Sequence, residues 1–88
     1  MFKNTTKEKL KNGQAVWGAM VYDYSISALE IFGHLGFDWL LLDNEHGHIT
    51  TQVFPQCVQS CESSNITPIV RPIGNTPEII RPFLDLGA

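Results

Sequence analysis

The sequence has few of the features that would set it apart from ordinary small globular proteins. Its two cysteines are too few for a disulfide framework. Six lysines and arginines stand against nine aspartates and glutamates, which excludes the basic surface that binds nucleic acid or an anionic membrane. The polar N-terminus has no apolar signal region, and no apolar run is long enough to span a membrane. We therefore expect a cytoplasmic protein.

The two cysteines, Cys57 and Cys61, are spaced four residues apart on a predicted helix, so both lie on one of its faces. Two ligands on one helix do not complete a zinc site. With Phe54 and Val58 the cysteines form an apolar stripe, and free cysteine is among the most buried residue types. We predict that both are core residues rather than metal or redox groups.

The composition is that of a globular domain, with 43% hydrophobic and 17% charged residues. The 88 residues allow one small domain, because single domains usually run to about 100–150 residues. We treat residues 1–88 as one unit. A chain of this size buries only about 60–65% of its unfolded surface, so it needs a very good core or a partner.

Helical and strand-like segments alternate along the chain, which is typical of a parallel α/β unit. We predict an N-terminal helix followed by about three β-α units. The helices are expected at 7–12, from 27 to a cap at 36, from 50 or 51 to about 63, and from 77 to a stop at 87, with strands at 15–21, 37–42 and 67–70. The first two strands are almost wholly apolar, which predicts that both of their faces are buried.

The helix between the first two strands has a clear start, because Ser27 and Glu30 are spaced as a capping box. Its buried stripe is predicted to be Ala28, Ile31, Phe32 and Leu35. The last helix is predicted to bury Ile79, Ile80, Phe83 and Leu84. We expect Trp17 and Trp39 in the core.

Two prolines, Pro55 and Pro82, lie inside predicted helices, where each removes a hydrogen bond and costs about 3 kcal/mol. We therefore expect these helices to begin late or to kink. The chain stops at residues 85–88, where a further strand should begin. Three parallel strands cannot close a barrel and leave sheet edges exposed, so we expect the chain to be a fragment.

The residues suited to chemistry follow the second and third predicted strands. The run Asp43-Asn44-Glu45-His46-Gly47-His48 follows the second strand, and Arg71 follows the third. In (β/α) barrels the active site is built at these strand ends. Histidine suits general base work beside a carboxylate, and the guanidinium fork binds a carboxylate or a developing enolate oxygen. Together they can abstract a proton and stabilise the resulting anion.

Simpler interpretations exist for several of these side chains. Asp43 and Glu45 can serve only to cap the next helix or to solvate a loop. We expect His48 to be an exposed loop residue, and His34 to be a surface residue favoured near a helix C-terminus. A further reading takes His46 and His48 as a His-x-His zinc pair of the amidohydrolase kind. The glycine between them, after the strand has ended, weakens that geometry.

The segments GFDWLLLDNEHG, PIVRP and LDLGA resemble the HpcH/HpaI aldolases, the class II pyruvate aldolases that include 2-dehydro-3-deoxyglucarate aldolase. The resemblance runs from about Gly13 to Ala88. It implies the N-terminal portion of a (β/α)8 TIM barrel of roughly 250 residues. It also implies a metal-dependent carbon–carbon lyase that cleaves 4-hydroxy-2-oxo acids to pyruvate and an aldehyde, through a pyruvate enolate, with magnesium, manganese or cobalt.

The same resemblance implies roles for five residues. His46 is the catalytic base, acting through a metal-bound water, and Arg71 binds the pyruvyl oxygen and stabilises the enolate. Asp43 and Asp85 match carboxylates hydrogen-bonded to that histidine, and Glu45 supports the water network around the metal. The family's metal-binding Glu and Asp lie on later strands, beyond residue 88, so this chain is expected to contain no metal ligands and to be inactive alone.

Two functions therefore stand side by side. In the first, the chain is part of a homo-oligomeric aldolase that acts on small-molecule 2-oxo acids and aldehydes. In the alternative, it is a truncated, non-catalytic remnant that persists by self-association or by binding a partner. Missing metal ligands and open sheet edges favour the second, whereas the motif at the strand ends favours the first.

Overall fold

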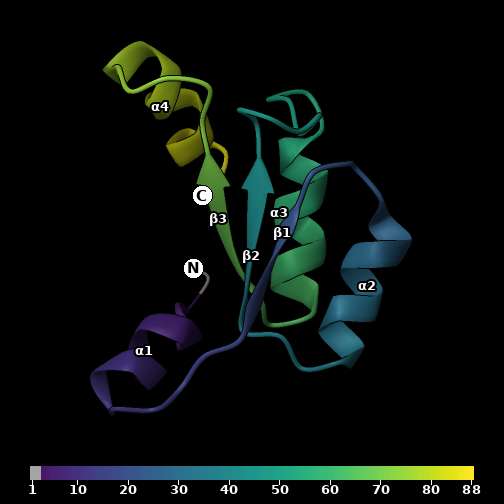
Figure 1. Cartoon of the computed structure of the whole chain (residues 1–88), viewed down its shortest axis with the longest axis vertical. Helices are drawn as coiled ribbons and strands as arrows, with labels where there is room; N and C mark the ends of the chain where they lie inside the picture. The colour runs from purple at the N-terminus through teal and green to yellow at the C-terminus, as the bar shows by residue number, and fades with distance from the viewer. Residues whose placement is uncertain (1–2) are drawn as a thin grey trace.

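The computed structural model describes residues 3–88 of the chain. The elements are α1 Thr5–Lys11, β1 Gly18–Val21, α2 Ile26–His34, β2 Trp39–Asp43, α3 Phe54–Ser63, β3 Thr67–Arg71 and α4 Pro77–Asp85 (Figure 1). The strands form one sheet in the order β1-β2-β3, and both neighbouring pairs are parallel. The predicted parallel α/β order is thereby confirmed. No helix within residues 3–88 is long and apolar enough to cross a membrane.

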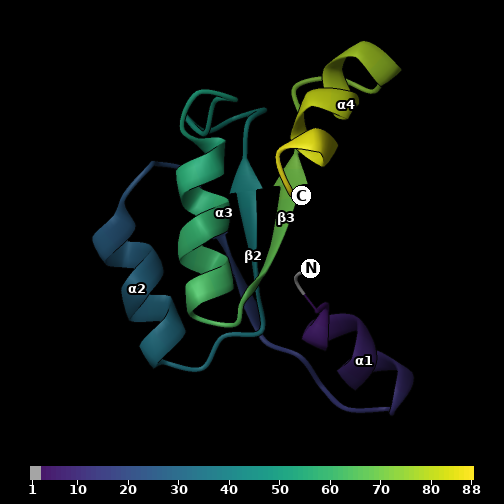
Figure 2. The same ribbon diagram turned by 180° about the vertical axis from the view of Figure 1, so that it is seen from behind.

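The core lies between the sheet and the two helices α2 and α3, which cover one face of it (Figure 2). Leu40 and Leu42 of β2 are fully buried there, because alternate residues of a strand point to the same face. The predicted stripe of α3 packs against them, and Cys57 and Cys61 are both fully buried and free. Burial raises the pKa of both thiols, that of Cys61 to about 12. The prediction of core cysteines is confirmed.

The opposite face of the sheet is partly open, so the prediction that the strands are buried on both faces is wrong for this chain. Met20, Leu41 and Ile69 are register partners and form one row across that face. Met20 and Ile69 are exposed. Trp39 is half-buried and lies over Gly18, where an added Cβ would be 1.9 Å from the indole ring. Neither α2 nor α3 reaches this side of the sheet (Figure 2).

Trp17, predicted in the core, is 73% exposed because β1 begins only at the next residue. The backbone of Trp17, rather than its side chain, connects it to the rest of the fold. The Trp17 N–H donates to the Asp38 carboxylate (2.9 Å), and its carbonyl accepts from the Asp38 N–H (2.7 Å). These bonds lead the chain from α1 into the sheet.

The cap of α2 lies two residues earlier than predicted. Ser25 is the N-cap, and its hydroxyl accepts from the Ala28 N–H (3.3 Å), so the capping box starting at Ser27 is wrong. The buried face shifts accordingly to Ile26, Leu29 and Phe32, and the predicted stripe members Ile31 and Leu35 are exposed. Similarly, α1 is capped by Asn4, whose side chain accepts from the Lys7 N–H.

The two prolines are accommodated differently. The helix α3 begins late, as expected, and Pro55 lies in its first turn, where its missing N–H has no intrahelical partner to lose. Pro82 lies inside α4. That helix is held to α3 by an edge-to-face contact between Phe83 and Phe54, with ring centroids 5.1 Å apart. Leu84, predicted on the buried face, is exposed.

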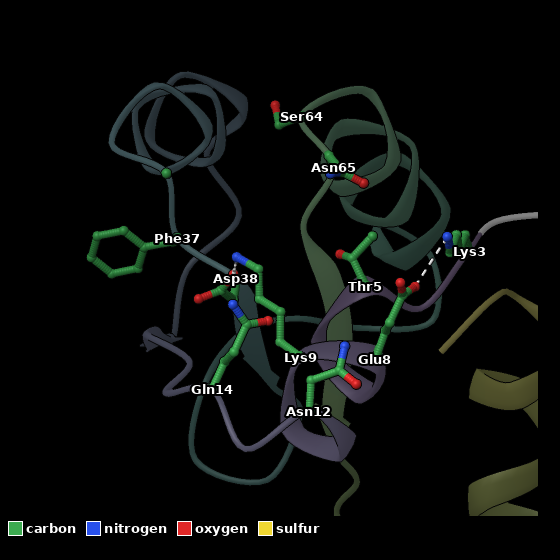
Figure 3. A pocket seen from close by; sticks show the side chains of 11 residues that line it. Lys3, Thr5, Glu8, Lys9, Asn12, Gln14, Phe37, Asp38, Ser64 and Asn65 are labelled. Atoms are coloured by element: carbon green, nitrogen blue, oxygen red, sulfur yellow. Dashed lines mark hydrogen bonds and ion pairs between the residues drawn. The ribbon is translucent and has the colours of Figure 1, made fainter.

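The helix α1 covers the end of the sheet at which β2 and β3 begin, and a polar network holds it there. Asp38 is buried and receives the Lys9 ammonium at 2.6 Å, which holds the pKa of that carboxyl below its usual range. The Thr6 hydroxyl donates to the Asp38 carbonyl (2.9 Å) and contacts the Thr67 hydroxyl (2.8 Å). A polar cleft of about 400 Å³ opens beside this network (Figure 3). Its two lysines are each paired with a carboxylate, Lys3 with Glu8 and Lys9 with Asp38.

Candidate active site

The candidate site lies at the C-terminal ends of β2 and β3, where Asp43 and Arg71 are register partners. Asp43 is the last residue of β2 rather than the first of a loop. Asn44, which the sequence reasoning did not single out, ties the loops together. Its backbone N–H donates to the Arg71 carbonyl (2.9 Å), and its side chain accepts from the Ile73 N–H (3.0 Å) and donates to the Ile49 carbonyl (3.0 Å).

The Asp43 carboxylate is fully buried and accepts four hydrogen bonds. Two come from Arg71, from Nε to Oδ1 (3.2 Å) and from Nη2 to Oδ2 (2.5 Å). The other two come from the backbone N–H groups of Glu45 (2.8 Å) and His46 (3.0 Å). The guanidinium in particular holds the pKa of Asp43 well below its usual range, and the carboxylate in turn raises the pKa of Arg71. Both groups are therefore charged at neutral pH.

The imidazole of His46 is not bonded to Asp43, which contacts only its backbone. The side chain is 69% exposed, and its Nε2 lies 3.3 Å from Oε1 of Glu45. The same Glu45 oxygen lies 3.6 Å from Nε of Arg71. Four of the five residues that the resemblance selected therefore form one continuous cluster, in which Glu45 links the histidine to the arginine.

Asp85, the fifth of these residues, lies apart from the cluster. It is the last residue of α4, and its side chain is exposed. Within residues 3–88 no hydrogen bond or ion pair joins it to His46. This arrangement does not bring the two side chains together, and the pairing of Asp85 with the histidine remains a prediction.

The two histidines of the His-x-His pattern contact different carboxylates. Nδ1 of His48 lies 2.6 Å from Oδ1 of Asp23, and the His48 side chain is exposed, as predicted. His34 is exposed in the last turn of α2, also as predicted. Among the described residues, no group of three or more His, Cys, Asp or Glu side chains could hold a metal ion. The zinc interpretation therefore finds no support in the geometry.

A close approach of two loops fixes the position of the cluster. The His48 N–H donates to the Tyr22 carbonyl at 2.6 Å, which joins the end of β1 to the loop after β2. A Cβ on Gly47 would lie 2.5 Å from that carbonyl oxygen and 2.6 Å from the Asp43 carbonyl oxygen. Only glycine fits between these two backbones.

Chemically, this arrangement offers an anchored guanidinium beside an accessible imidazole. Two of the five N–H donors of Arg71 go to Asp43, which leaves three for an anionic oxygen outside the cluster. Because Arg71 is bonded to Asp43, its register partner on β2, the orientation of the guanidinium is fixed before any ligand arrives.

Three known proteins illustrate what the chain is similar to, although no family model matches it. It is 38% identical over 86 residues to the hydroxypyruvate/pyruvate aldolase of Roseobacter denitrificans. It is 37% identical over 89 residues to the 4-hydroxy-2-oxo-heptane-1,7-dioate aldolase of Salmonella dublin. These alignments cover 97% and 98% of the chain but only 33% of each relative. The crystal structure of an HpcH/HpaI aldolase from Desulfitobacterium hafniense superposes with a TM-score of 0.82 at 27% identity, over 93% of this chain and 32% of that one.

The chain therefore spans about a third of the length of the curated relatives it matches. Its helices and three parallel strands correspond to part of a (β/α) barrel. The open face and the open edge of β3 follow from this, because a barrel encloses its strands only when the sheet closes on itself.

Proposed function

We propose that this chain, which is similar to the HpcH/HpaI aldolases in sequence and fold, forms the pyruvate-binding and proton-transfer part of such an aldolase. Residues 1–88 are then one unit of a partial barrel. The observation that carries the proposal is the anchored Arg71 beside the accessible His46 at neighbouring strand ends. The printed names of its relatives support the reaction class, and substrates would be small 2-oxo acids and aldehydes.

In this proposal His46 takes a proton from the methyl carbon of pyruvate. The electron pair of the broken C–H bond forms the enolate double bond, and the negative charge moves to the C2 oxygen. Arg71 holds that oxygen through its remaining donors, while Asp43 fixes the guanidinium. The enolate carbon then bonds to the aldehyde carbon, and the new alkoxide takes the proton back from the imidazolium. Cleavage of a 4-hydroxy-2-oxo acid is the same sequence in reverse.

The described residues do not contain a complete set of ligands for the divalent metal that the resemblance implies. Asp43 already accepts four N–H donors, and His46 with Glu45 makes too small a ligand set. Among the described residues no larger set is available. The residues present do not fit a complete metal site, so we derive no step through a metal. In the proposal its carboxylate ligands come from the rest of a longer barrel.

A chimera tests the proposal. Residues 1–88 replace the matching third of the Roseobacter denitrificans aldolase, so that the remaining strands and their ligands are supplied by the relative. With manganese present, the chimera should release pyruvate from a 4-hydroxy-2-oxo acid. A chimera that folds, binds the metal and releases no pyruvate would contradict the proposal.

The alternative, a non-catalytic remnant that persists by association, is favoured by an apolar groove of about 990 Å³ along β3 between α1 and α4. The N–H groups at this edge are few. The backbone N–H of Thr67 and the carbonyl of Arg71 are hydrogen-bonded toward β2. The backbone groups of the alternate positions 68, 70 and 72 therefore point to the open edge. Pro68 and Pro72 have no N–H, and a partner there would bind mainly through apolar contacts.

The size of the chain in solution discriminates between the two functions. In the alternative, the groove is covered and the chain is an oligomer or a complex at micromolar concentration. A monomer by light scattering under those conditions would contradict it. The homo-oligomer and the cytoplasmic location predicted from sequence remain predictions that localisation and sizing experiments can check.

A further inference from the structure

Two carboxylates of different character flank the same guanidinium. Asp43 is fully buried and accepts four hydrogen bonds. Glu45, by contrast, is 39% exposed, and its contacts with Arg71 and His46 are longer, at 3.6 Å and 3.3 Å. Exposed ion pairs of this length contribute little to stability. Asp43 is therefore a fixed partner of Arg71, whereas Glu45 can be displaced.

A single oxygen of Glu45 makes both of these contacts. Oε1 lies between Nε of Arg71 and Nε2 of His46. A negatively charged oxygen at that position meets the positive charge of the guanidinium on one side and the imidazole on the other. The proposed aldol reaction requires this environment for the enolate oxygen, because the charge develops there while the proton resides on the histidine.

We propose that Glu45 acts as a placeholder carboxylate, whose oxygen occupies the position of the substrate oxyanion until the substrate displaces it. The inference rests on the proposed function and deepens it by assigning the anion position. Two oxygens cannot occupy one position, and once the enolate forms the like charges of the two would also repel strongly. Glu45 must therefore swing away when a 2-oxo acid binds, and the same movement frees the imidazole for proton transfer.

This role makes Glu45 a specificity-determining residue. A ligand gains affinity only if its oxygen binds Arg71 and His46 better than the carboxylate it replaces. Planar 2-oxo acids and their enolates carry a 2-oxo or enolate oxygen next to the carboxylate and can contact both groups at once, whereas acetate has a carboxylate alone. A purely structural Glu45, which merely orients the imidazole, would compete with no ligand.

Oxalate, a planar dianion that mimics the pyruvate enolate, serves as the probe in an experiment on the full 88-residue chain. Its affinity is measured by NMR from the shift of the Arg71 Nε–H signal. Glu45→Gln keeps the size of the side chain and removes its charge, and Glu45→Ala repeats the test without the amide. Glu30→Gln removes the same charge from the exposed surface of α2 and is the matched control.

If Glu45 is a placeholder, both substitutions at this position tighten oxalate binding, on the order of fivefold to tenfold. Glu30→Gln should change it by less than about twofold, the screened effect of net charge. Unchanged or weaker binding in both Glu45 variants, with the Arg71 signal still shifting, overturns the placeholder and leaves the anion site intact. If the Arg71 signal shifts in no variant, the anion site fails, and with it both the placeholder and the proposed function.

Discussion

The guanidinium of Arg71 donates from Nε and Nη2 to the two oxygens of Asp43, so that one ion pair joins the ends of β3 and β2. The carboxylate is completely buried, and two backbone N–H groups complete its coordination. The pair is thus built into the sheet, in contrast to the more exposed His46 beside it. Its geometry decides where the remaining donors of Arg71 are directed.

The paired donors predict that lysine cannot replace this arginine. Arg71→Lys removes the fork that binds both oxygens of Asp43 and leaves a single ammonium with no fixed direction. In the chimera described above, pyruvate release should fall by about 100-fold or more. Arg81→Lys, on the exposed side of α4, is the control and should retain activity. Equal activity of the two variants would show that the fork is dispensable.

The two depressed carboxyl pKa values predict how stability depends on pH. Asp38 and Asp43 titrate lower in the folded chain than in the unfolded one, where an aspartate has a pKa near 3.9. Their contribution is therefore fully present above about pH 4 and is lost as the pH falls through the folded values. Urea midpoints should change little from about pH 7 to 5 and fall below about pH 4.

The variant Asp38→Asn tests this assignment. It removes the charge that pairs with Lys9 but keeps an acceptor for the Trp17 N–H. The fall of the urea midpoint below about pH 4 should become shallower than in the parent chain. Tryptophan fluorescence can follow the unfolding. A slope identical to that of the parent would mean that Asp38 is not a source of the pH dependence.

The contact between two loops predicts that Gly47 cannot be replaced by alanine without loss. The new methyl group would meet two backbone oxygens, those of Tyr22 and Asp43, so a whole loop must move. We expect a destabilisation of about 1–3 kcal/mol and a displaced His46. Gly74→Ala is the control, because within 3 Å its methyl group meets only the mobile end of Ile79. Thermal melts of both variants check the difference.

The contact of Phe83 with Phe54 predicts that α4 depends on a single aromatic anchor. Phe83→Ala should cost about 3–5 kcal/mol, the usual range for a buried phenylalanine, and release the helix from α3. Hydrogen exchange of the α4 amides should accelerate. Leu84→Ala, one residue along and exposed, should have little effect. Equal protection in both variants would argue that other contacts hold the helix.

The place of the chemistry along the chain is predictable because parallel strands bring their C-terminal ends to one edge. The apolar run before Asp43 and the short strand before Arg71 are sufficient to set the two residues side by side. Asn44 and Asp38 were missed because their side chains accept hydrogen bonds from backbone groups far away in the sequence, those of Ile73 and Trp17. The bridging position of Glu45 depends on side-chain rotamers, which no spacing in the sequence encodes.

The buried face of α2 was not predictable from apolar spacing alone. The helix approaches the end of α3 so closely at Gly33 that an added Cβ would lie 2.5 Å from Ser64. This small residue turns the side containing Leu29 inward and leaves Ile31 exposed. Hydrophobic periodicity counts large residues, whereas close helix packing is decided here by a glycine. Trp17 was misplaced for a different reason, because its backbone is hydrogen-bonded to Asp38 while its indole is left exposed.

The central claim, that this chain provides the proton-transfer step of an aldolase, is tested most directly by the exchange of pyruvate methyl hydrogens in D2O. This half-reaction needs no aldehyde and is followed by proton NMR in the chimera with manganese. The account predicts measurable exchange that slows by about 10²- to 10⁴-fold in the His46→Gln chimera. Exchange at the same rate in both chimeras would contradict it.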